Sequence, residues 1–209
     1  MAIDSMNKVI HAAVRRDLGR LETALSTVAD GDRDRAAGLG RAWDNLDRQL
    51  RHHHQQEDSL LFPAMSQLGV DGSLLSTLEG EHETMGRALD EIDTTMRSYA
   101  TSASATDAAA AADAVRRGLP VVEIHLAHEE AELEPLMQPH LESAQWKAVE
   151  RQLRKQPPTR TGWFFAWIQD GASAEVMGYL GSAVPAPVRF VFANGFGRGY
   201  QKSVAAVWR

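Results

Sequence analysis

The sequence predicts an all-α protein built on an up-down-up-down four-helix bundle, with additional helices after the bundle. Three observations support this fold class: apolar residues recur at alternating steps of three and four, no alternating strand pattern competes, and one helical hairpin occurs twice. Short turns between long amphipathic helices favour antiparallel neighbours, which predicts the up-down order.

The first two bundle helices are predicted from apolar stripes that turn signals separate. The first stripe runs over residues 11–28 and stops at the Asp-Gly-Asp turn of residues 30–32. The second runs over residues 36–64 and ends near Gly69. These two stripes form the first predicted helical hairpin.

The other two bundle helices follow the same pattern. The third stripe occupies residues 75–99, and the fourth occupies residues 115–136 after the Ser/Thr/Ala linker of residues 100–106. Pro120 lies inside the fourth stripe, so we expect it to kink that helix or to begin it afresh.

Composition changes near Pro157, and we divide the chain there into residues 1–156 and 157–209. Residues 1–156 carry a net charge of −9 and end with a fifth helix over about 142–155, whereas the second region carries +3 and holds ten of the fourteen aromatic residues. The second region is predicted to form two or three short helices that pack on the bundle as a lid. A dimer face or a membrane-surface contact is the alternative use of these aromatic residues.

Composition also limits the class of protein. The 209 residues are 44% hydrophobic and 24% charged, which is the balance of a globular protein with a sizeable core. With 22 Lys+Arg against 28 Asp+Glu, the formal charge is −6, so nucleic acid is not an expected partner. No cysteine is present, which excludes thiolate ligands and iron–sulfur clusters. Any metal must therefore be held by nitrogen and oxygen.

Export and membrane signals are absent from the sequence pattern. Residues 1–20 contain charged side chains and no continuous apolar segment. The densest apolar run, residues 163–168, is far shorter than the ~20 residues that a spanning helix needs. We therefore expect a cytoplasmic protein without a transmembrane segment.

The two hairpins share polar residues as well as apolar ones. The pattern His-x-x-x-Glu-[Asp or Glu]-x-x-Leu-x-Pro begins at His53 and again at His125. The separation from His11 to His53 is 42 residues, and the separation from His82 to His125 is 43. The bundle is therefore interpreted as a duplicated helical hairpin.

Histidines and glutamates within the apolar stripes are the candidate metal ligands, because burying such groups is costly unless they are paired or bound to metal. The candidates are His11, His53, Glu57, His82, His125 and Glu129. Each of the four histidines lies eighteen to twenty-two residues from the turn or linker of its own hairpin. At an equal rise per residue, the four side chains therefore share one layer of the bundle. A His and a Glu four residues apart on a helix point the same way, which places both carboxylates in that layer. Six such donors suit two carboxylate-bridged ions, either iron or alternatively zinc or manganese.

Other polar residues beside the stripes are expected to play smaller parts. His54 with Asp58 is the competing i,i+4 pair, but it would place the ligands off the apolar stripe of its helix, so the pair His53 and Glu57 is favoured. The histidines expected at the surface or as hydrogen-bond partners of ligands are His52, His54, His128 and His140. The carboxylates expected as exposed helix charges are Asp58, Glu130 and Glu132, of which Asp58 or Glu130 is alternatively a partner that orients a ligand imidazole.

The ligand pattern resembles the hemerythrin-like or HHE cation-binding domain over about residues 5–140. The residues that carry the resemblance are His11, His53-x-x-x-Glu57, Leu61-Phe62-Pro63, His82 and His125-x-x-x-Glu129. The resemblance implies a non-haem di-iron site with Glu57 and Glu129 as bridges. Members of that family bind dioxygen reversibly, sense oxygen or iron, or react with peroxide or nitric oxide. Dioxygen, peroxide and nitric oxide are therefore the expected small ligands.

One position departs from the oxygen-carrying hemerythrins, whose third helix has His-x-x-x-His. Four residues after His82 stands Gly86, so either an open coordination position or another group is expected there. An open position favours turnover of a small oxidant over its storage. The first hypothesis is thus a catalase-like di-iron oxidoreductase, and the second is a non-enzymatic sensor or interaction module. An oligomer formed through residues 157–209 is compatible with both hypotheses.

Overall fold

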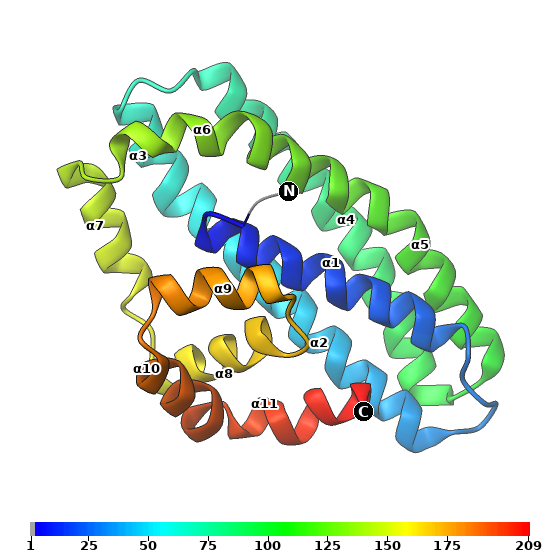
Figure 1. The fold of residues 1–209 in the computed structure, drawn as a ribbon. Coiled ribbons are helices and arrows are strands. Elements are labelled where there is room, and N and C mark those ends of the chain that lie inside the picture. The colour runs from blue at the N-terminus through cyan, green and yellow to red at the C-terminus, as the bar shows by residue number, and fades with distance from the viewer. Residues whose placement is uncertain (1–2) are drawn as a thin grey trace.

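The computed structural model describes residues 3–209, and every regular element within that range is a helix (Figure 1). The all-α fold class is therefore confirmed. Four long helices form the body of the molecule: α1 (Met6–Leu25), α2 (Arg33–Gln56), α4 (Gly72–Ser102) and α5 (Ala105–His128).

Each of the four long helices starts at a polar capping residue. The side chains of Ser5, Asp32, Asp71 and Ser104 each accept a hydrogen bond from a backbone N–H in the first turn of the helix. The turn between α1 and α2 contains Gly31 with φ of +79°, a backbone conformation that side chains with a Cβ rarely adopt. Local sequence signals thus set the helix boundaries.

Neighbouring long helices run antiparallel. Helix α1 contacts α2 and α5, and α4 contacts the same two helices. Side-chain pairs between neighbours fall in opposite chain order, and these pairs are Arg15–Glu123 and Glu22–Arg116 between α1 and α5, and Trp43–Asp93 and Arg51–Asp90 between α2 and α4. The four helices therefore enclose one common interior.

Two apolar clusters fill that interior on either side of a polar layer. The larger cluster includes Leu50, Met85 and Leu126, and the smaller cluster includes Leu61 and Leu78. The predicted metal ligands of α2 and α4 lie between these positions along their helices. Apolar packing therefore encloses the polar layer from both ends.

Two π-helical turns continue α2 and α5 at equivalent places. They are η1 (Glu57–Leu61) and η2 (Glu129–Leu133), and they lead into α3 (Phe62–Gln67) and α6 (Glu134–Met137). The N–H of Phe62 bonds to the carbonyl of Glu57, five residues back. A proline follows each π turn, and because its ring cannot fit against the carbonyl four residues back, the wider turn relieves that clash. The repeated Leu-x-Pro motif thus coincides with a repeated π turn at each candidate bridging glutamate.

Pro120 does not begin a new helix. Helix α5 continues through it as one element, so the alternative of a fresh start at that residue is wrong.

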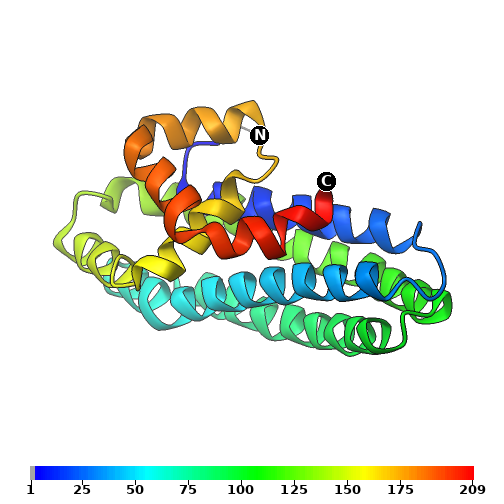
Figure 2. The same cartoon turned by 90° about the horizontal axis from the view of Figure 1, so that it is seen from below.

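Shorter helices follow the bundle (Figure 2). They are η3 (Gln138–His140), α7 (Ala144–Leu153), α8 (Pro158–Gln169), α9 (Ala174–Ala183), α10 (Ala186–Phe190), η4 (Val191–Phe196), α11 (Arg198–Ser203) and η5 (Ala205–Trp208). Among residues 3–209, no single helix has both the length and the apolar composition to cross a membrane, and α9 reaches them only when combined with residues 186–196 across a bend of 116°.

The residues after 157 lie against α1 and α2 (Figures 1 and 2). The fully buried Trp167 donates from Nε1 to Asp17 Oδ2 at 2.8 Å, and Trp163 Nε1 donates to Asn45 Oδ1 at 2.6 Å. Asp17 lies six residues after His11 in α1, or about 9 Å along the helix axis. These contacts attach the tail to α1 and α2, and closure of the metal pocket by the tail stays a prediction.

Candidate metal centre

The four histidines of the predicted ligand set meet inside the bundle in two pairs. The Nε2 atoms of His11 and His53 lie 3.3 Å apart, and the Nε2 atoms of His82 and His125 lie 3.2 Å apart. His11, His82 and His125 are buried, and the side chain of His53 is only 10% exposed. Their ring nitrogens therefore face a shared interior space.

The two glutamates lie between the histidine pairs. Glu57 places Oε1 3.1 Å from His53 Nε2 and Oε2 3.5 Å from His82 Nε2. Glu129 Oε2 lies 3.3 Å from His11 Nε2 and 4.0 Å from His125 Nε2. Each carboxylate thus reaches one histidine of each pair, which is the placement that a bridge between two ions requires.

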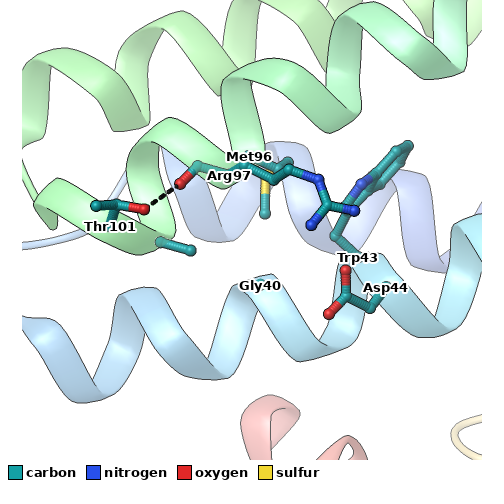
Figure 3. A pocket seen from close by; sticks show the side chains of 7 residues that line it. Gly40, Trp43, Asp44, Met96, Arg97 and Thr101 are labelled. Atoms are coloured by element: carbon teal, nitrogen blue, oxygen red, sulfur yellow. Dashed lines mark hydrogen bonds between the residues drawn. The ribbon is translucent and has the colours of Figure 1, made fainter.

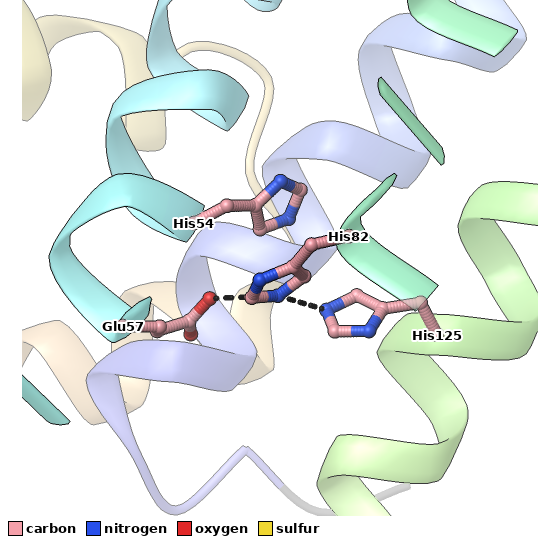
Figure 4. A group of neighbouring side chains, drawn as sticks. All are labelled: His54, Glu57, His82 and His125. Atoms are coloured by element: carbon pink, nitrogen blue, oxygen red, sulfur yellow. Dashed lines mark hydrogen bonds and ion pairs between the residues drawn. The ribbon is translucent and has the colours of Figure 1, made fainter. Parts of the chain in front are cut away.

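His54 is the residue for which the structure departs most from the sequence interpretation. Its side chain is not at the surface, since only 7% of the residue is exposed. Its ring stacks on His82 with centroids 4.4 Å apart and meets His125 edge-on at 5.2 Å (Figure 4). The expectation of a surface position for His54 is therefore wrong.

The geometry of α2 explains this burial. Successive residues on a helix are about 100° apart, so His53 and His54 point in different directions. Helix α2 has two neighbours in the bundle, and while His53 faces His11 of α1, His54 faces His82 of α4. A single apolar stripe, which was the basis of the sequence interpretation, describes only one of these directions.

The donor atoms form two groups. One group holds His11, His53 and Glu129, and the other holds His54, Glu57, His82 and His125, with the donor atoms of each group all within 4.8 Å of one another. Each group combines imidazole with carboxylate, and such donors bind transition metals such as iron, zinc or manganese.

Several of these donors lack any other partner. Among the residues that the structure describes, both carboxylate oxygens of Glu57, both of Glu129 and the Nε2 of His54 are buried without a hydrogen bond. A buried polar atom without a partner costs about 1–3 kcal/mol, and more when it is charged. Metal ions would satisfy these atoms together, so the residues fit the group that the sequence implies.

The electrostatics of the layer also favour cations. Burial, followed by the charge of Glu129, raises the pKa of Glu57 well above its usual range. Burial and the neighbouring His11 lower the pKa of His53 to about 3. His53 is therefore neutral at pH 7, with a nitrogen lone pair available to a metal. A cation would relieve the repulsion that keeps two buried carboxylates from ionising together.

Three carboxylates lie against the outer nitrogens of the candidate ligand histidines. The pairs are His11 Nδ1 with Glu130 Oε1 at 2.7 Å, His82 Nδ1 with Asp58 Oδ1 at 2.7 Å, and His125 Nδ1 with Glu81 Oε2 at 3.2 Å. A carboxylate that accepts the Nδ1–H fixes the ring and leaves Nε2 free toward the interior. The alternative role of Asp58 and Glu130, as partners that orient a ligand imidazole, thus fits the structure.

Two of these carboxylates differ from what the sequence suggested. Glu130 is buried and also accepts from Arg15, so its interpretation as an exposed charge is wrong, whereas Asp58 and Glu132 are exposed. Glu81 belongs neither to the repeated His-x-x-x-Glu motif nor to an apolar stripe, so the sequence does not identify it as a partner of a ligand. It binds His125 and also lies 2.7 Å from Nδ1 of His128, a histidine expected to have an outer role.

Replacing Glu81 by Ala is expected to weaken metal binding by about 10-fold to 100-fold, because loss of an outer partner leaves the His125 ring free to turn away. Competition with a chelator in the iron-loaded protein measures this change. The control is Glu83→Ala, which removes an exposed carboxylate from the same helix. Equal affinity in the two variants would show that Glu81 does not orient a ligand.

A separate surface pocket of about 320 Å3 lies between α2 and α4 (Figure 3). Trp43, Met96 and Arg97 are among the residues that line it. Trp43 precedes His53 by ten residues in α2, or about 15 Å along the helix axis. This pocket is therefore not part of the polar layer that holds the candidate ligands.

Comparison with known protein families gives a match. The family model of the hemerythrin HHE cation binding domain matches residues 4–153. No curated protein and no solved structure matches the chain. The matched range contains both donor groups in full.

Proposed function

The chain belongs to the hemerythrin HHE cation-binding family, and from this premise we propose that it is a non-haem di-iron protein that binds dioxygen or peroxide and turns over small oxidants. One observation carries the proposal most directly. Glu57 and Glu129 each lie between two histidine pairs, which places donors for two ions on either side of shared carboxylates.

The donor chemistry favours iron within this proposal. Neutral imidazoles with bridging carboxylates suit iron that changes oxidation state, although zinc and manganese accept the same donors. Bound iron would supply electrons and act as a Lewis acid toward a small oxidant.

The chain's own residues hold and isolate the site. Glu130, Asp58 and Glu81 fix the ligand imidazoles through their Nδ1 atoms. Phe62 stacks against the His82 ring with centroids 5.5 Å apart, and Met85 is fully buried on the other side of His82 along α4. Such apolar cover keeps bulk water from the layer and favours an uncharged oxidant over a charged one.

A second function, sensing of iron or oxidant, is favoured by one contact. Helix α1 carries His11 and, six residues later, Asp17, which binds Trp167 of the tail. A change at the metal layer that moved α1 would therefore reach the tail. Exposed apolar residues of the tail, Phe190 at 67% and Val191 at 52%, offer a surface for a second copy of this chain.

A cytoplasmic location stays a prediction.

Adding peroxide to the iron-loaded protein separates these functions. Sustained oxygen evolution is expected if the protein turns over peroxide. A single change in the visible spectrum without oxygen evolution would favour binding or sensing. If neither the spectrum nor the peroxide concentration changes, the proposed oxidant chemistry is wrong.

A further inference from the structure

We propose that His54 is a metal ligand that supplies the imidazole absent at Gly86. This inference rests on the proposed two-metal function. The sequence indicates that His54 lies at the surface or is a hydrogen-bond partner of a ligand, so a ligand role differs from both expectations.

The space beside Gly86 is open to another donor. Gly86 lies one turn after His82 on the same face of α4, and a Cβ atom added there would meet no atom within 4 Å. Helix α2 runs antiparallel to α4, and it brings His54 from the opposite side onto the His82 ring. The imidazole that the third bundle helix lacks is thus supplied by the second.

The His54 ring has an unused donor atom in the correct place. Its Nε2 is buried and has no hydrogen-bond partner among the described residues, and the ring belongs to the donor group of Glu57, His82 and His125. Figure 4 shows these four side chains converging from α2, η1, α4 and α5. If His54 only filled space against His82, a phenyl ring would do so without burying an unpartnered nitrogen.

His54 makes the donor groups unequal. Since each glutamate reaches both histidine pairs, the groups differ in their imidazoles: His54, His82 and His125 serve one position, whereas only His11 and His53 serve the other. The two-histidine position also includes His53, the one site histidine whose side chain is as much as 10% exposed.

The test compares full-length His54→Phe with wild type and with His52→Ala after loading with ferrous iron. His54→Phe keeps a ring that stacks on His82 but removes the nitrogen donor. We expect this variant to remain helical by circular dichroism, to keep fewer than two ions per chain after challenge with a chelator, and to show an altered visible spectrum. His52→Ala changes a half-buried histidine two residues before His54 that belongs to neither donor group, so this variant should keep both ions.

A relocation variant adds an independent check. His54→Ala combined with Gly86→His adds an imidazole one turn after His82 on the same face of α4, so it should recover the second ion that His54→Ala loses. If His54→Phe and His54→Ala keep both ions and the wild-type spectrum, His54 is not a ligand, and the two-metal function stands without it. If wild type itself does not hold two ions, the proposed function fails first.

Discussion

Glu57→Gln is expected to reduce bound iron from two ions to at most one per chain, the largest functional effect of a single substitution in this protein. Glu57 reaches His53 with one oxygen and His82 with the other. An amide has a similar shape but no negative charge, so it cannot compensate the charge of two cations. Loss of an outer partner alone costs 10-fold to 100-fold in affinity, and we expect loss of a bridge to cost at least ~100-fold.

The same substitution should leave the metal-free fold intact. Burial raises the pKa of Glu57 well above its usual range, so a neutral side chain at this position is tolerated without metal. Iron content and thermal unfolding of the metal-free protein are the two measurements. Glu132→Gln, an exposed change in the second π turn, is the control and should keep both ions. An iron content equal to that of wild type in Glu57→Gln would contradict the bridging role.

Trp167→Ala is expected to lower the free energy of unfolding by about 3–5 kcal/mol, the largest effect on stability. Trp167 is fully buried and donates to the buried Asp17, so the substitution leaves a cavity and removes a hydrogen bond from a carboxylate. For a chain of this size, such a loss corresponds to a decrease in Tm of roughly 10 °C.

A conservative variant separates the two contributions. Trp167→Phe keeps most of the apolar ring but loses the donor to Asp17, so we expect a loss of about 1–3 kcal/mol. Thermal unfolding followed by circular dichroism compares both variants with wild type. A Trp167→Ala protein with the wild-type Tm would show that Trp167 contributes no stability to the fold.

The parts of the fold that the sequence predicted depend on local and repeated patterns. The separations between the long helices follow from turn and linker signals at residues 30–32 and 100–106, and buried faces follow from steps of three and four. The duplicated hairpin allowed six candidate ligands to be chosen from one motif and its copy, and the structure brings all six into one layer. Repetition was informative because chance seldom places the same costly residues twice at equivalent depths.

The site roles that the sequence did not predict arise from contacts between helices. His54 faces α4, and only the packing of α2 against α4 shows this. Glu81 contacts His125 across 44 residues of sequence, and no local pattern marks that pairing. The π turns had a possible signal in the repeated prolines, Pro63 and Pro135, but a proline after a helix is also typical of an ordinary helix end.

Metal content per chain, measured together with the visible absorption spectrum before and after exposure to peroxide, tests the central claim most directly. Two donor groups joined by Glu57 and Glu129 predict two iron ions per chain and an absorption that changes with the oxidant. One tightly bound zinc ion per chain, with no absorption that responds to peroxide, would contradict the di-iron account.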